Sequence, residues 1–314
     1  MKLVSIPANP VPDHVVTGSI KTPDGVNLRF ARWEPPPGRK GTVVVLQGRA
    51  EYIEKYYETV RDLRARGFAV ATFDWRGQGL SDRALPDRNK GYVRNFSEYA
   101  TDLEAVMEQV VLPDCPPPIF ALGHSMGGAI VIRACHDGSR WFERIVLSAP
   151  MIALPQGPLT RVAGPLARVM RLIGRGSGYV PTGDTAATGS QEFMGNVLTS
   201  DPVRYARNAA VLEEAPDLGL GAPTIAWADA AMRLMKRLAD PSYAGQIRQP
   251  ILMVAAGRDE VVSTPAIETF GMNLLAGRHL ILPGSRHEIL QEQDQYRGQF
   301  WAAFDAFVPG TSLY

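Results

Sequence analysis

The stretch FALGHSMGGAI (120–130) carries one serine, Ser125, between small residues, where an apolar run gives way to a helical pattern. A Gly-x-Ser-x-Gly sequence between a strand and a helix is typical of a nucleophile elbow, a sharp turn that exposes the serine oxygen at the carboxyl edge of a parallel sheet. Gly123 and Gly127 allow this turn because they carry no side chain that could collide with neighbouring elements. The amino end of the following helix favours negative charge beside the serine. We therefore predict that Ser125 is a nucleophile.

A serine hydroxyl becomes a good nucleophile only beside a base, and the base needs a carboxylate to orient it. After an elbow of this kind the acid and the histidine follow in chain order, each just beyond a strand. Asp259 follows the apolar run ILMVAA, and His287 follows the run HLILP. Glu260 is the rival acid, but Asp259 stands closer to the end of its strand. The remaining histidines are expected to be structural: His14, His124, His136 and His279.

Acyl transfer also requires backbone N–H groups that bind the oxyanion formed in the reaction. One predicted donor is the amide of Met126, directly after the nucleophile. The second is the amide of Arg49, in the loop that follows the apolar run VVVL. Gly48 lets this loop turn closely toward a substrate, and we count it, together with Trp227, as a substrate-binding residue. The alternative, that this loop is a simple strand-to-helix turn, stays open.

Short apolar runs rich in β-branched residues precede these candidate residues. The runs are continuous rather than alternating, as expected for parallel strands that are buried on both faces. Amphipathic segments lie between them, and this alternation builds a parallel sheet with helices on both faces. The segment 26–33 (VNLRFARW) alternates and is predicted to be an antiparallel edge strand. The predicted parallel strands are 43–46, 68–73, 118–122, 144–149, 251–256 and 279–283.

One helix between the strands is predicted over 97–111, with Ser97 as its N-cap. Its apolar residues recur at helical spacing, and Asp102 stands on the opposite face. Arg76, in the preceding segment WRGQGLS (75–81), is expected to pair with a nearby carboxylate. That segment lacks the glycine spacing of a dinucleotide-binding turn.

The strand–helix alternation stops between about Met151 and Ser242, where glycine and proline breaks separate several helical patterns. We predict that 151–242 is a helical lid inserted after the sixth strand, and that 1–150 and 243–314 form the core. Trp227, Met232 and Met235 in this lid either line an acyl channel or belong to the packed interior.

The first part of the predicted lid is basic and amphipathic. Arg161, Arg168 and Arg175 recur every seven residues opposite an apolar face. A helix of this kind can lie on an anionic lipid surface or attract an anionic head group. The alternative is a solvated helix that covers an acyl pocket, because Gly164 and Pro165 are expected to interrupt the helix.

Composition argues against several other classes of protein. The 314 residues are 45% apolar and carry a net charge of +1, so nothing points to nucleic-acid binding. Two cysteines, Cys115 and Cys135, are too few for a disulfide framework or a metal cluster and fit a reducing compartment. No apolar run reaches 18 residues, and the first residues do not resemble a signal peptide. We expect a cytoplasmic location, with peripheral contact at the inner membrane face through the lid as an option, and leave the oligomeric state open.

Over almost the whole chain the sequence resembles α/β-hydrolases of the monoacylglycerol lipase and bacterial lysophospholipase group, which is also grouped with serine aminopeptidase-like hydrolases. QGRAEYIEKY (47–56) resembles the group's His-Gly-x-x-Glu-x-x-x-Arg-Tyr loop, although Gln47 and Lys55 replace its His and Arg. These departures affect side-chain hydrogen bonds of the loop but not its backbone amide. The other matching segments are FDWRGQGLSD (73–82), GHSMGG (123–128) and 200–227, which is similar to the lid of bacterial lysophospholipases.

The resemblance implies an α/β-hydrolase fold, with a mostly parallel eight-stranded sheet flanked by helices. It implies hydrolysis of carboxylic esters of lipid-like monoacyl substrates through an acyl-enzyme, with Ser125, His287 and Asp259 as the triad and without a metal or organic cofactor. Two alternatives stay open: an aminopeptidase-type serine hydrolase, and a non-catalytic ligand-binding protein on the same scaffold. A dehalogenase is excluded because it would carry Asp at position 125.

Overall fold

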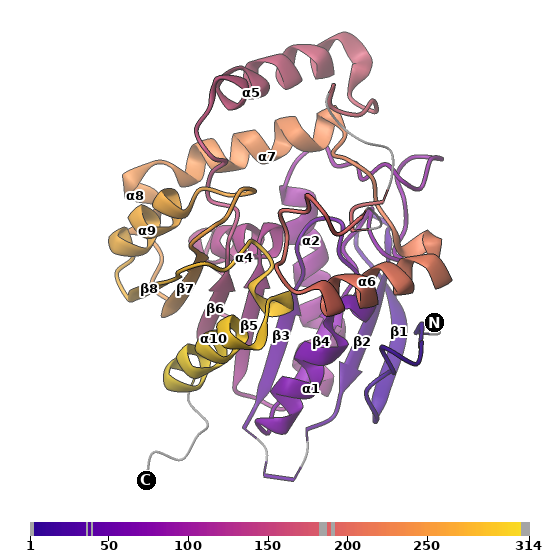
Figure 1. Cartoon of the computed structure of the whole chain (residues 1–314). Helices are drawn as coiled ribbons and strands as arrows, with labels where there is room; N and C mark the ends of the chain where they lie inside the picture. Colours follow the sequence, from indigo (N-terminus) through magenta and orange to yellow (C-terminus); the bar gives the residue numbers. More distant parts are fainter. Residues whose placement is uncertain (1–2, 36, 39, 182–186, 190–191, 309–314) are drawn as a thin grey trace.

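The computed structural model describes the chain except residues 1–2, 36, 39, 182–186, 190–191 and 309–314, and it describes no side chain for 158, 159 and 161. Its centre is an eight-stranded sheet in the order β1-β2-β4-β3-β5-β6-β7-β8 (Figure 1). β2 pairs antiparallel with β1 and β4, whereas all neighbours from β4 to β8 are parallel. The strands are β1 (Val15–Lys21), β2 (Asn27–Trp33), β3 (Thr42–Leu46), β4 (Ala69–Phe73), β5 (Ile119–His124), β6 (Arg144–Ser148), β7 (Ile251–Ala256) and β8 (Gly277–Leu282).

Helices from the segments between the strands cover both faces of the sheet. In Figure 1, α1 and α10 lie in front of the sheet, and α2 and α4 lie behind it. On the α10 side, Phe68 packs edge to face against Phe120 of β5 and Phe304 of α10. The helices of the predicted core are α1 (Tyr57–Ala65), α2 (Ser97–Val106), α3 (Leu112–Asp114), α4 (Met126–His136), α9 (Thr264–Asn273) and α10 (Asp294–Phe307), with shorter helical turns at Ile53–Tyr56, Met107–Val111 and Ile289–Gln291.

The predicted fold class is confirmed, and every predicted parallel strand is present within two residues of its expected bounds. Two statements about the sheet edges are wrong. The segment 26–33 is not an edge strand, because β1 pairs along its outer side over seven residues. The other edge is β8, and its residues Arg278, His279 and Leu280 are exposed rather than buried on both faces. A strand with apolar residues can be an edge strand, and only the neighbours it pairs with decide this.

The local predictions around α2 are partly wrong. Ser97 is the first helical residue and does not cap the helix, since the N-cap position belongs to Phe96. The side chain of Asn95 accepts a hydrogen bond from the Ser97 amide at 3.1 Å. Asp102 is buried rather than solvated, because it binds Arg76 at 2.7 Å. This ion pair confirms that Arg76 pairs with a carboxylate.

The segment between β6 and β7, which we call the lid segment (151–242), contains several helices joined by irregular chain in its described residues. It lies over the carboxyl edge of the sheet, with α5 on top of α7 in Figure 1. Pro165 does not interrupt α5, contrary to the prediction, and a Cβ on Gly164 would meet Met232 of α7 at 3.7 Å, an ordinary contact distance. The division into core and lid is our proposal, which this element order supports. The helices are α5 (Pro158–Met170), α6 (Pro202–Glu214), α7 (Ile225–Leu238) and α8 (Pro241–Ala244), with helical turns at Arg171–Arg175 and Pro216–Leu218.

Candidate active site

The turn between β5 and α4 holds Ser125 in a strained backbone conformation. Its φ of 49° and ψ of −113° lie in a region that residues other than glycine rarely adopt. The flanking glycines are required by space. A Cβ on Gly127 would lie 2.2 Å from the Leu46 carbonyl oxygen, and a Cβ on Gly123 would lie 3.0 Å from the Gly128 Cα. The chain therefore turns sharply at Ser125, as the elbow sequence predicts.

The structure brings Ser125, His287 and Asp259 together although they are far apart in the sequence. His287 Nε2 lies 3.0 Å from Ser125 Oγ, and His287 Nδ1 lies 2.8 Å from Asp259 Oδ2. With the Nδ1 proton donated to the carboxylate, Nε2 has a free lone pair that faces the serine hydroxyl. In this geometry His287 can act as a general base, because Asp259 holds its imidazole in one tautomer.

The carboxylate of Asp259 is fully buried and held by backbone groups. Its second oxygen accepts hydrogen bonds from the amides of Val261 and Val262 at 2.8 and 2.9 Å. Glu260, the rival acid, is exposed. The contact with His287 thus belongs to Asp259.

The loop after β3 is held by a buried ionic cluster. Glu51 accepts hydrogen bonds from the Gly48 amide at 2.5 Å and from the Tyr56 hydroxyl at 2.6 Å. Lys55 lies 2.9 Å from Glu51 and 2.6 Å from Glu288, the residue after His287. Burial by itself would raise the pKa of Glu51, but Lys55 and then His124 lower that pKa to about 2. Lys55 therefore ties the loop of Gly48 to the segment that carries His287.

His124 was expected to be structural, and its contacts place it beside the triad. Its Nδ1 lies 3.0 Å from the Ser148 carbonyl oxygen, and its ring centre lies 4.9 Å from that of His287. Burial lowers the pKa of His124 below its ordinary value, so the ring is neutral at pH 7 and adds no positive charge next to His287. No sequence pattern distinguished this histidine, since its contacts come from β6 and from the segment after β8.

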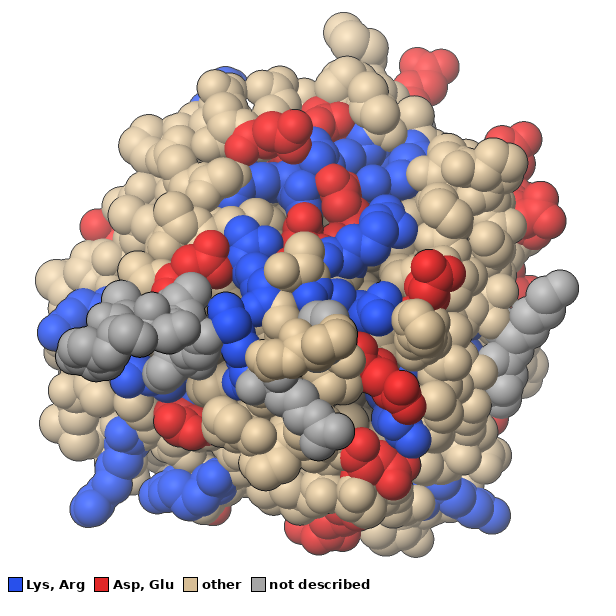
Figure 2. Space-filling view, turned by 90° about the horizontal axis from the view of Figure 1, so that it is seen from below, with Lys and Arg blue, Asp and Glu red and all other residues tan. Residues whose placement is uncertain are grey.

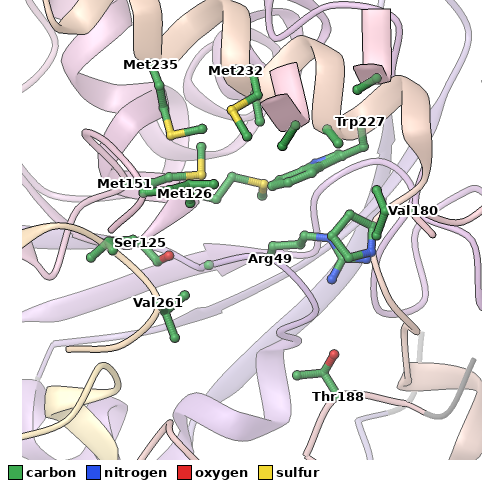
Figure 3. A pocket seen from close by; sticks show the side chains of 18 of the residues that line it. Arg49, Ser125, Met126, Met151, Val180, Thr188, Trp227, Met232, Met235 and Val261 are labelled. Carbon is green, nitrogen blue, oxygen red and sulfur yellow. The ribbon is translucent and has the colours of Figure 1, made fainter. Parts of the chain in front are cut away.

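A cavity of about 520 Å³ opens beside Ser125, under α5 and α7. All the predicted site residues except Asp259 line it, and most other lining side chains are apolar. Figure 3 shows Met151, Met232 and Met235 above Ser125, with Trp227 farther along. Trp227 and Met235 are also buried, so they line the cavity and belong to the packed interior at once. The Trp227 Nε1 donates to the Tyr99 hydroxyl at 3.1 Å.

The side chain of Arg49 was given no role from the sequence, where only its backbone amide counted. It lies in the cavity wall, where its Nη2 donates to the Gly221 carbonyl oxygen at 2.5 Å. Its guanidinium carbon lies 5.2 Å from the centre of the Trp227 ring. Both contacts come from the lid segment, which explains why the motif around Arg49 did not reveal them.

Apolar side chains of α5 and of the turn after it face outward. Val169, Leu172 and Ile173 are 55%, 70% and 66% exposed. Val162 and Leu166 are also exposed, and they border the cavity. Of the three arginines in the predicted basic face, Arg168 and Arg175 are exposed. The Arg161 side chain lies outside the described residues.

The described residues also bear on metal binding and membrane insertion. In that part of the chain no three His, Cys, Asp or Glu side chains are grouped so that they could hold a metal ion. No helix there has the length and apolar composition needed to cross a bilayer.

Comparisons with known proteins agree with this architecture. The family described as "Serine aminopeptidase, S33" matches residues 37–294. Lysophospholipase L2 of Escherichia coli is 32% identical over an alignment of 284 residues that covers 87% of this chain and 82% of that protein. The monoacylglycerol lipase of Mycolicibacterium smegmatis is 26% identical over 282 residues, covering 86% of this chain and 89% of its own length.

A solved structure shows the same fold. It is a soluble variant of the monoglyceride lipase from Saccharomyces cerevisiae in complex with a substrate analogue. The TM-score is 0.73 at 20% identity, covering 96% of this chain and 98% of that one. The extent of the family match and the identity to lysophospholipase L2 lead to one conclusion: the chain belongs to the serine aminopeptidase family, with an α/β-hydrolase fold.

Proposed function

We propose that this protein hydrolyses carboxylic esters of lipid-like monoacyl substrates through an acyl-enzyme. One observation carries the proposal: Ser125 Oγ, His287 and the buried Asp259 form a hydrogen-bonded chain beside a largely apolar cavity. The names of the relatives, lysophospholipase and monoacylglycerol lipase, support the same substrate class.

The reaction begins when His287 Nε2 takes the proton of Ser125 Oγ, which bonds to the substrate carbonyl carbon. Asp259 stabilises the imidazolium that forms. The amides of Arg49 and Met126, both in the cavity lining, would donate to the carbonyl oxygen as it becomes negative. His287 then returns the proton to the leaving alcohol. A water molecule, deprotonated by the same histidine, releases the acid and restores the hydroxyl of Ser125.

The cavity favours an ester over an amino-terminal peptide. An aminopeptidase needs a free carboxylate to hold the charged amine of its substrate. The acidic residues in the described lining are Glu51 and Glu288, and both bind Lys55. The apolar remainder suits an acyl chain, whose burial stabilises binding by about 0.8 kcal/mol for each methylene group.

We further propose that α5 contacts a lipid surface. The exposed side chains of Val169, Leu172 and Ile173 lie on the same segment as Val162 and Leu166, which border the cavity. A lipid could thus pass from the membrane surface to Ser125 without crossing water. The arginines Arg168 and Arg175 add attraction to anionic head groups.

A fluorophosphonate probe tests the catalytic proposal, since it labels only an activated serine. We expect labelling of the wild-type protein and none of Ser125→Ala. Turnover is then compared for monoacylglycerols, lysophosphatidyl lipids and aminoacyl arylamides. Failure to label either protein would favour a non-catalytic binding protein, and turnover of the arylamides alone would favour an aminopeptidase.

A further inference from the structure

The guanidinium of Arg49 lies in the cavity wall and has no carboxylate partner in the described part of the chain. No ion pair within 4.0 Å between described residues includes Arg49, although Lys55 in the neighbouring cluster binds two carboxylates. Its Nη2 donates to the Gly221 carbonyl oxygen, and its Nε is buried without a hydrogen-bond partner among the described residues. An arginine has five N–H donors on three nitrogens, and Nη2 is the one that donates to a described residue.

The buried Lys and Arg side chains in the described part of the chain have carboxylate partners. Arg29 binds Glu54 at 2.8 Å and Asp74 at 2.6 Å, and all three side chains are fully buried. This pairing is expected because an unpaired buried charge loses its hydration without compensation. Arg49 differs from them because it is half-buried and has no carboxylate partner among the described residues. The missing compensation can come from an anionic ligand.

Arg49 keeps its charge at neutral pH. Burial lowers the pKa of its guanidinium to about 10, and the phenols of Tyr99 and Tyr179 oppose this change. The ring of Trp227, 5.2 Å away, stabilises a cation through its π face and presents no competing acceptor. The cavity therefore contains a fixed positive charge with free donors.

The position of this charge relative to Ser125 divides the cavity into two chemically different sides. In Figure 3 the Arg49 side chain extends from the region of Ser125 toward Val180, away from Met151 and Met235. An ester places its acyl chain and its alcohol on opposite sides of the carbonyl carbon. With the acyl chain among the methionines, the alcohol portion faces Arg49.

We propose that the Arg49 guanidinium binds a phosphate on the alcohol portion of the substrate and thereby selects phosphate-bearing monoacyl esters over uncharged ones. A guanidinium donates two parallel hydrogen bonds to a phosphate, and the pair is stronger in a site with little water. This inference rests on the proposed ester hydrolysis and names the residue that discriminates between its two candidate substrate groups. Arg49 thus acts twice, through its amide on the oxyanion and through its side chain on the head group.

Two esters that differ only in the phosphate provide the test: 1-octanoylglycerol 3-phosphate and 1-octanoylglycerol, both below their aggregation concentrations. Arg49→Met removes the charge but keeps a long apolar side chain and the backbone amide. We expect kcat/KM for the phosphate ester to fall about tenfold to a hundredfold, the range for a lost charge-assisted hydrogen bond. Any loss on the uncharged ester should be smaller, so that the ratio of the two kcat/KM values shifts in favour of the uncharged ester. Arg49→Lys should restore part of the preference.

Arg237→Met is the matched control, because Arg237 is exposed on α7. An equal loss on both esters in Arg49→Met would assign the side chain a structural role and overturn the inference, as would an unchanged ratio. Fluorophosphonate labelling of Arg49→Met shows that Ser125 remains reactive in this variant. If the wild-type protein is not labelled and cleaves neither ester, the proposed function has failed; if it is active and only the ratio is unaffected, the Arg49 inference alone has failed.

Arg49 could instead bind the carboxylate of the fatty-acid product, and an inhibition experiment distinguishes this carboxylate from a phosphate. Glycerol 3-phosphate and octanoate are compared as inhibitors of 1-octanoylglycerol hydrolysis. We expect inhibition by glycerol 3-phosphate that Arg49→Met weakens about tenfold. Inhibition by octanoate alone with that dependence on Arg49 would overturn the assignment to phosphate.

Discussion

The carboxyl edge of the sheet, where Ser125 lies, and the lid segment differ in how completely their side chains find partners among the described residues. At the carboxyl edge, buried Asp259 binds His287, and buried Lys55 binds both Glu51 and Glu288. In the lid segment, by contrast, large apolar side chains of α5 are exposed, and the arginine that lies beneath the lid has no described carboxylate partner. The difference supports our proposal that the lid side, and not the edge that carries Ser125, contacts a lipid.

The face of the molecule far from α5 carries charged side chains of both signs. Figure 2 shows it from below, with Lys and Arg side chains interspersed with Asp and Glu. Ion pairs of this kind join neighbouring helices, as in Arg66–Asp305 between α1 and α10. A surface of mixed charge is well hydrated, which is consistent with a molecule that approaches a lipid layer with α5 first and keeps the opposite face in water.

The largest expected effect is at the triad. Ser125→Ala should reduce kcat by roughly 10⁴-fold to 10⁶-fold, and Asp259→Asn by about 10⁴-fold, because the imidazole loses its tautomer. Glu260→Gln is the matched control and should retain nearly full activity, since that carboxylate is exposed. The rate of ester hydrolysis, measured for the three variants, shows which carboxylate supports catalysis. A loss in Glu260→Gln as large as in Asp259→Asn would contradict the assignment of the acid.

The buried cluster behind the loop should contribute strongly to stability. Lys55→Met leaves Glu51 and Glu288 buried without their cation, and we expect the free energy of unfolding to fall by about 3–5 kcal/mol. Urea denaturation measures this change. Lys236→Met, on the exposed side of α7, should change stability by less than about 0.5 kcal/mol. Similar values for the two variants would show that the cluster is not as strongly coupled as its geometry indicates.

The pH dependence of stability gives a sharper test of the same cluster. The pKa of Glu51 is lowered to about 2 in the folded protein, below the value of about 4.3 expected in the unfolded chain. Its stabilisation is therefore complete above about pH 5 and is lost as the pH falls from about 4.5 toward 2. The difference in unfolding free energy between the wild type and Glu51→Gln should shrink across that interval. A difference that stays constant from pH 5 to pH 2.5 would argue against a lowered pKa.

The smallest expected effect is on the exposed apolar side chains of α5 and of the turn Arg171–Arg175 that follows it. Replacing Val169, Leu172 and Ile173 with serine should weaken binding to vesicles of phosphatidylglycerol and phosphatidylcholine by about tenfold or more, since each buried apolar side chain contributes roughly 1 kcal/mol. Hydrolysis of a water-soluble short-chain ester should stay unchanged. Sedimentation with vesicles measures the binding.

The control for this experiment replaces Met272 and Leu275, which are similarly exposed but lie at α9. Their replacement with serine should leave vesicle binding unaltered. Equal losses in the two sets of variants would show that apolar exposure in general, rather than the α5 face, governs the attraction to lipid.

Much of the active site could be predicted because its motifs are local. The elbow around Ser125 depends on two glycines within two residues of it, and steric space at those positions demands them. Asp259 and His287 each follow a strand, so their meeting at one sheet edge follows from the parallel topology. Ser97 shows the reverse case: a good capping residue did not become the cap, because Asn95 binds its amide instead.

The order of amino acids alone was enough to predict the fold class, the elbow and the succession of the triad residues, since each depends on residue types close along the chain. The folded structure was needed to show that His124 lies beside His287, that Lys55 reaches Glu288 and that the Arg49 side chain has no described carboxylate partner. All three observations concern residues that are far apart in the chain. Whether such residues meet depends on burial and on distances of a few ångströms, and a pattern of neighbouring residues does not contain this information.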